Sequence, residues 1–211
     1  MEPGWASEHL QVIRTLMERA AVYRRALAPT TLVTGGIGAA AALIGWFMRI
    51  ESPRGFGLFW IAVSVVAVCG AFWAVRSQAL KDQEPFWSPP MRRVTQALLP
   101  PLVAGLVAAL LVVLPEGAPP ARVWWLPPIW MVLYGCALHA AGFFMARGIK
   151  LFGWGFMVLG CACAVAVSLR MGADGLPALG NAHWLMGATF GGLHLAYGAY
   201  LYLTEKRKNA A

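Results

Sequence analysis

Two histidines within apolar segments are the residues best placed to do chemistry. His139 and His194 each stand in a Leu-His-x-Ala motif, and Tyr134 and Tyr197 lie near them in the sequence as candidate hydrogen-bond partners. An imidazole can donate and accept hydrogen bonds and can ligate a metal. In lipid, such a polar group is costly without a partner and often marks a functional site.

The histidine pair allows three interpretations. In the first, each ring is a neutral imidazole whose partner is a carbonyl, a hydroxyl or a tyrosine, and it stabilises a close helix pair. In the second, the rings line a small-molecule or sensing site. In the third, they ligate a b-type haem, which needs two axial nitrogens and a flat apolar slot. Apart from this haem alternative, no cofactor and no metal site is predicted.

Glycines recur at helical spacing on the face that carries each histidine. They are Gly135 and Gly142 in the first segment, and Gly187, Gly191 and Gly198 in the second. Inside lipid, small residues let two helix backbones approach closely. We therefore expect the two segments to pack directly against each other, with His139 and His194 facing the bundle interior at one shared site.

Other catalytic and metal-binding patterns are missing from the sequence. Cys161 and Cys163 are two residues apart and would point in different directions on a helix, without a third ligand nearby. We find no carboxylate pair and no His-Glu-x-x-His motif, so an enzyme is not expected. Because the apolar segments lack Asp and Glu in their interiors, proton- or sodium-coupled transport is also disfavoured.

The elements that must position these residues are membrane-spanning helices. The 211 residues are 59% hydrophobic and only 12% charged, about half the charge of a soluble domain. Six segments approach the ~20 residues needed to cross a bilayer. They cover about 29–48, 56–75, 96–114, 124–146, 150–169 and 182–203. Short connections predict an all-α protein with these six helices in three hairpins.

Two further parts flank the 29–203 membrane domain. Residues 7–27, within the segment 1–28, predict an amphipathic helix that lies on the membrane surface or caps the bundle. Residues 204–211 form a basic tail. Thirteen of the 17 Lys and Arg residues fall in these flanks and in the connections on the same side, and four fall on the other side. The positive-inside rule then places both termini in the cytoplasm.

The connection over 76–95 is a candidate partner surface because aromatic and basic residues gather in it. Phe86 and Trp87 precede two prolines, and Arg92 and Arg93 follow them. Loops often carry function, although the two aromatic residues could equally dip into the membrane interface. The basic residues lie between apolar spans, so direct nucleic-acid binding is not expected.

Three stretches resemble a group of bacterial six-span membrane proteins that has no established activity. They are Phe86-Trp-Ser-Pro-Pro with Arg92-Arg93 and Leu99-Pro-Pro, Tyr134-Gly through Ala146-Arg-Gly, and Phe190-Gly-Gly-Leu-His with Gly198. The likeness covers most of the chain. It implies a bacterial inner membrane and a gene neighbour that encodes a winged-helix regulator.

Together these observations favour a multi-pass inner-membrane protein of regulatory or sensory type. It would present a cytoplasmic surface to a soluble regulator, with the lipid bilayer as its other partner, and a homo-oligomer is compatible with the sequence. The alternative is a channel or facilitator for a small neutral solute, and the third choice is a haem b protein.

The uneven distribution of basic residues yields a topology prediction. We expect a reporter fused at the C-terminus to give a cytoplasmic signal, and one inserted within 171–181 to give an external signal. A C-terminal tail that protease removes from intact cells would contradict this orientation.

Overall fold

The computed structural model describes residues 26–209 apart from 84, 116, 118, 146, 173 and 174. The amphipathic helix expected over 7–27 lies almost wholly outside the described residues. Every regular element in the described part is helical. The helices are Ala26–Phe47, α2 (Pro53–Lys81), α3 (Pro89–Val113), α4 (Pro120–Val123), α5 (Leu126–Ala141), α6 (Arg147–Gly172), α7 (Gly180–Met186), the π-helix η1 (Gly187–Leu193) and α8 (His194–Asn209).

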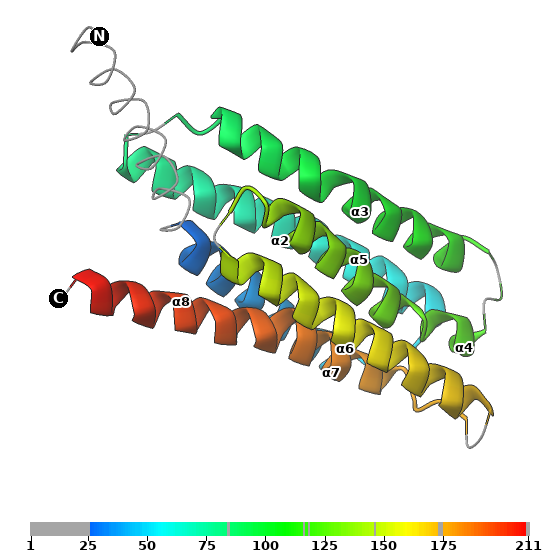
Figure 1. The fold of residues 1–211 in the computed structure, drawn as a ribbon. Coiled ribbons are helices and arrows are strands. Elements are labelled where there is room, and N and C mark those ends of the chain that lie inside the picture. Colours follow the sequence, from blue (N-terminus) through cyan, green and yellow to red (C-terminus); the bar gives the residue numbers. More distant parts are fainter. Residues whose placement is uncertain are drawn as a thin grey trace, which may run out of the picture.

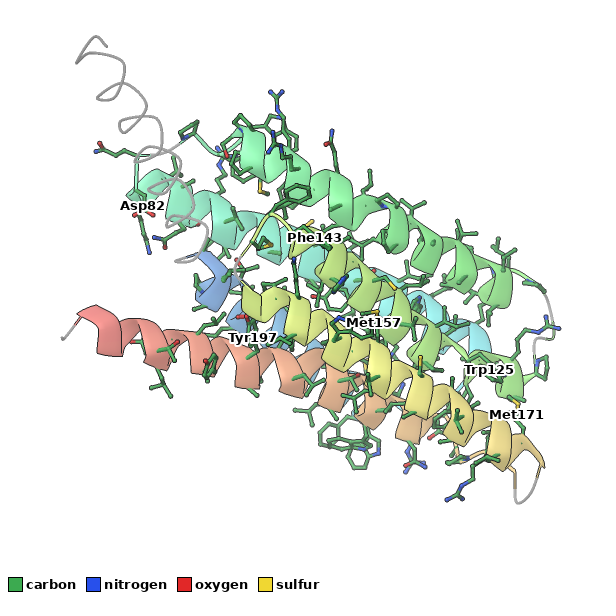
Figure 2. All side chains as sticks on the ribbon, viewed as in Figure 1. Asp82, Trp125, Phe143, Met157, Met171 and Tyr197 are labelled. Carbon is green, nitrogen blue, oxygen red and sulfur yellow. The ribbon has the colours of Figure 1, made fainter. Side chains whose placement is uncertain are left out.

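The long helices lie side by side in a bundle with their axes roughly aligned (Figure 1). The start of the first described helix, the α2–α3 and α5–α6 connections and the end of α8 lie towards one end. The other connections lie towards the opposite end. Figure 2 shows this polarity, with Asp82 at one end and Trp125 and Met171 at the other. Among the labelled elements, α5 packs most extensively against α6 and next against α3.

Four helices are long and apolar enough to cross a membrane: Ala26–Phe47, α2, α3 and the 148–171 part of α6. Large apolar side chains, such as Val65, Leu111 and Leu151, point outward from them. Water would make such faces costly, whereas lipid tails make them favourable. The chain is thus a helical membrane protein.

The other two predicted spans differ from simple long helices. α5 ends at Ala141 rather than near 146, because the Phe143 and Phe144 N–H groups donate to the carbonyls of Ala140 and Ala141 in tight turns. Its 16 residues cover about 24 Å, less than the ~30 Å hydrocarbon core. The last predicted span is one helical run from Gly180 to Asn209, and η1 is a π-helical segment within it.

Glycines set the closest contact between α5 and α6. A Cβ atom on Gly135 would lie 2.7 Å from the carbonyl oxygen of Gly153, and a Cβ atom on Gly153 would lie 2.8 Å from the carbonyl oxygen of Gly135. Neither backbone can move away easily, because each carbonyl is fixed within the backbone of its own helix. The two helices therefore touch at a position where only hydrogen fits.

A comparable contact joins the first described helix to the last helical run. Cβ atoms on Gly38 and Gly191 would lie 3.0 and 2.7 Å from the backbone nitrogens of Gly191 and Ala39, respectively. Gly187 faces Ala42 in the same contact, and Gly198 faces Thr31 and Leu32 about two helix turns further along. Small residues on both helices therefore allow their backbones to meet.

The reciprocal glycine contact between α5 and α6 can be tested with a matched pair of variants. We expect Gly153→Ala to lower the free energy of unfolding by about 1–3 kcal/mol, the usual cost of overpacking. Gly155→Ala, two residues further along the same helix, meets nothing within 4 Å and should leave stability unchanged or slightly higher. Thermal unfolding in detergent would compare them, and equal effects would refute the close contact.

Candidate functional site

The central polar contact of the bundle joins α5 to α8. The Tyr134 hydroxyl and His194 Nε2 lie 2.7 Å apart, a hydrogen bond in which either group can be the donor. The His194 side chain is only 3% exposed. The structure thus provides one of the two tyrosines considered from the sequence as the partner of this imidazole.

Aromatic rings surround the Tyr134–His194 pair on the remaining sides. Phe152 and Phe156 of α6 lie with their ring centroids 5.1 and 5.4 Å from that of His194. Phe190 of η1 lies 5.5 Å from Tyr134 and 5.3 Å from Phe156. The hydrogen bond is therefore enclosed by apolar rings, where a lost partner costs more than it would in water.

A π-helix immediately precedes His194. η1 covers Gly187–Leu193, and π-helical turns occur frequently at functional sites. The His194 Nδ1 atom is buried without a hydrogen-bond partner. The carbonyls of Thr189 and Phe190, on the preceding turn, lie near this ring, but neither meets hydrogen-bond geometry with Nδ1. One nitrogen of the ring is thus bonded and the other remains free.

Tyr197 extends the cluster towards the beginning of α6. Its ring stacks on Phe152 with centroids 4.6 Å apart and an interplanar angle of 15°. Its hydroxyl is buried without a hydrogen-bond partner, close enough to Gly148 that a Cβ atom there would lie 2.5 Å away. Figure 2 shows Tyr197 near the start of α6. His194 and Tyr197 therefore both offer a free polar atom from α8.

His139 lies in different surroundings from His194. Its ring makes edge-on contacts with Phe143 and Trp154, at centroid distances of 5.5 and 5.6 Å. Its Nδ1 atom is buried without a partner. Because Trp154 lies on a different face of α6 from Phe152, which contacts His194, α6 separates the surroundings of the two histidines. The expectation of one shared site is therefore wrong.

The expected direct packing of the two glycine stripes is also wrong. Gly135 lies against Gly153, and a Cβ atom on Gly142 would lie 2.6 Å from Lys150 Cγ, so both glycines face α6. The glycines of the last helical run face the first described helix instead. All five glycines do lie at helix contacts, but α5 and α8 meet through Tyr134 and His194 rather than through glycine.

A third histidine, which we did not single out in the sequence, has both nitrogens satisfied. Trp60 Nε1 donates to His183 Nδ1 at 3.1 Å, and His183 Nε2 lies 3.0 Å from the Ile50 carbonyl oxygen. Because an indole can only donate, Nδ1 must be the acceptor and Nε2 must carry the proton. The ring is fully buried beside Phe56 and Phe59. His183 therefore ties α7, α2 and the 48–52 connection together as a neutral ring.

The candidate partner surface lies at the end of the bundle that carries Asp82. Phe86 is half-buried and makes an edge-on contact with Phe72 of α2, with ring centroids 5.9 Å apart. Trp87 is 47% exposed, and Arg92 and Arg93 are exposed on the first turn of α3. One aromatic residue thus anchors the connection while the other three residues face outward.

Metal binding finds no support in the described residues. Nowhere in this part of the chain do three or more His, Cys, Asp or Glu side chains gather as ligands. The four cysteines are all described and all unpaired, and Cys136 Sγ contacts Met157 Sδ at 3.6 Å. Cys136 therefore packs as an apolar group, whereas Cys69 and Cys161 lie on the exposed surface of the bundle.

The hydrogen bond between Tyr134 and His194 generates a stability prediction. Tyr134→Phe leaves both nitrogens of a buried imidazole unpartnered, so we expect a loss of about 1 kcal/mol, within the range for hydrogen bonds between membrane helices. Tyr200→Phe is the matched control, because that ring is exposed on α8. In a double-mutant cycle with His194→Phe, strictly additive losses in unfolding free energy would show that the two residues do not interact.

No protein-family model matches the chain, and no curated protein or solved structure is significantly similar to it. What the protein does must therefore follow from its own residues. These offer an enclosed tyrosine–histidine hydrogen bond beside a π-helix and an exposed aromatic and basic surface at one end of the bundle.

Proposed function

We propose that the protein is a six-span inner-membrane protein of regulatory or sensory type with both termini in the cytoplasm. α5 and the run from Gly180 to Asn209 are the two spans added to the four long helices. The alternating directions of the helices support this topology (Figure 1). So does the gathering of thirteen basic residues in the flanks and connections on one side of the membrane.

The exposed surface formed by Trp87, Arg92 and Arg93 is the observation that carries the regulatory assignment. Anchoring of Phe86 on Phe72 holds the connection against the bundle, so the three exposed groups have a fixed support. Trp and Arg are the side chains most enriched among residues that dominate protein interfaces. A soluble regulator with an acidic, apolar docking surface fits this combination.

The Tyr134–His194 cluster supplies a place where a signal could be read inside the membrane. A regulatory protein needs an element with two arrangements that a signal can bias. The π-helix is suited to this because it departs from regular α-helical hydrogen bonding next to His194. A change there would alter the contact of α8 with α5 while the Gly198 contact, which lies outside η1, keeps α8 against the first described helix.

The partner surface is tested by replacing its exposed side chains while keeping Phe86 for folding. We expect Trp87→Ser, Arg92→Ser and Arg93→Ser combined to abolish capture of a soluble partner, measured by in-cell photocrosslinking from the 86–93 connection. The control combines Trp184→Ser, Arg54→Ser and Arg122→Ser, which are exposed near the opposite end. The control should leave crosslinking unchanged, and both proteins should insert and unfold as the unaltered protein does.

The competing channel function predicts a different outcome. If the purified protein alone carries small neutral solutes into liposomes, and the three replacements leave that transport and all crosslinking unaffected, the regulatory assignment is overturned.

A further inference from the structure

A lysine at the α5–α6 turn is held in place without a counter-ion. Lys150 Nζ lies 3.6 Å from the centroid of the Phe143 ring, in a cation–π contact. Among the described residues no carboxylate pairs with it. Phe143 is itself 65% exposed, so the cation and the ring are both presented at the surface of the bundle. The Lys150 residue is half-buried, and an ammonium group carries three N–H donors.

Neighbouring residues build a defined seat for this lysine. A Cβ atom on Gly142 would lie 2.6 Å from Lys150 Cγ, so the glycine makes room for the aliphatic stem. His139 lies edge-on between Phe143 and Trp154, and Trp154 is 53% exposed. We call these five residues the Lys150 cluster. Its three rings and its lysine stem form one packed unit rather than a set of unrelated surface groups.

The local charges of the cluster favour an anion. The first turn of α6 carries Arg147 and Lys150 and no acidic residue. Cations at this position oppose the positive end of the helix dipole. An anion would relieve this opposition. The positive charge at this end of α6 therefore lacks a negative partner in the first turn of the helix.

The position of the cluster indicates where the anion comes from. It lies at the α5–α6 turn, towards the end of the bundle that carries most basic residues, and the apolar side chains of Phe144 and Leu151 flank it and point outward. Aromatic rings with a nearby cation are typical of the membrane–water interface. A lipid is the one anion source that would satisfy both the lysine and the apolar flank.

We propose that the Lys150 cluster is a binding site for the phosphate group of an anionic glycerophospholipid. The lysine contacts the phosphate, the exposed rings lie at the level of the glycerol backbone, and the acyl chains follow the outer face of α6. The site is independent of the partner surface on α3 and does not rely on the proposed function.

The test measures lipid preference of the full-length protein in mild detergent. Native mass spectrometry, after addition of equal amounts of phosphatidylglycerol and phosphatidylcholine with the same acyl chains, gives the ratio of the two bound lipids. We expect phosphatidylglycerol to be preferred, and Lys150→Gln to lower the preference by about five-fold, the effect of one cation near a membrane surface. Lys81→Gln, an exposed lysine towards the same end, is the control and should retain the preference.

Four further results decide between explanations. Lys150→Arg keeps the charge and should keep the preference for phosphatidylglycerol. If it does, the loss in Lys150→Gln comes from the missing charge and not from a folding defect. Gly142→Ala, which displaces the lysine stem, should weaken the preference. Equal losses for Lys150→Gln and Lys81→Gln would reduce the effect to diffuse attraction and overturn the proposal. Removal of the preference by millimolar inorganic phosphate would overturn the lipid as the source of the anion.

Discussion

Direct contact between helix backbones at glycine is the constraint on which the rest of this bundle depends. Where Gly135 meets Gly153, α5 and α6 lie too close for any side chain to fit between them. The larger side chains of α6 are therefore directed to either side of that contact. Phe152 and Phe156 lie beside His194, and Trp154 lies beside His139.

The second glycine contact directs His194 towards α5 and α6. Gly187 and Gly191 bring the last helical run against the first described helix, so that side of it is filled by backbone and by Ala39 and Ala42. A longer side chain on that side needs a glycine opposite it, as Leu195 has in Gly35. His194 instead turns to Tyr134. Two steric contacts that involve no polar side chains thus decide which polar side chains meet inside the bundle.

Much of the architecture could be predicted from the sequence, because hydropathy and helical periodicity depend on local residue order. The all-helical membrane class, the glycines at helix contacts and Tyr134 as one of two candidate partners of the histidines belong to this part. The identity of the packing partners could not be predicted. Gly153 and Ala39 are small residues like those in several other segments, and nothing in one sequence says which small face meets which.

Two other features, η1 and the hydrogen bonds of His183, also could not be predicted from local sequence. The π-helix η1 depends on how its backbone is packed. A π-helical turn holds more residues than an α-helical turn, and a hydropathy pattern does not reveal this difference. His183 escaped notice because its partners, Trp60 and the Ile50 carbonyl, are more than a hundred residues away in the chain. An early sign was the Phe56, Phe59 and Trp60 group on one face of a predicted span, which fits around a flat ring.

The buried His183 and His194 and the half-buried His139 differ in how fully their nitrogens are bonded. At His183, a new ligand would have to displace Trp60 or the Ile50 carbonyl, so binding would break a hydrogen bond for each one it forms. At His194, Nδ1 is free while Nε2 remains bonded to Tyr134. A hydrogen bond formed there adds to the existing network, so its free energy is available to shift α8 against its neighbours. In the function proposed above, the half-bonded ring beside the π-helix is therefore the position at which a signal would act on the helices at the least cost.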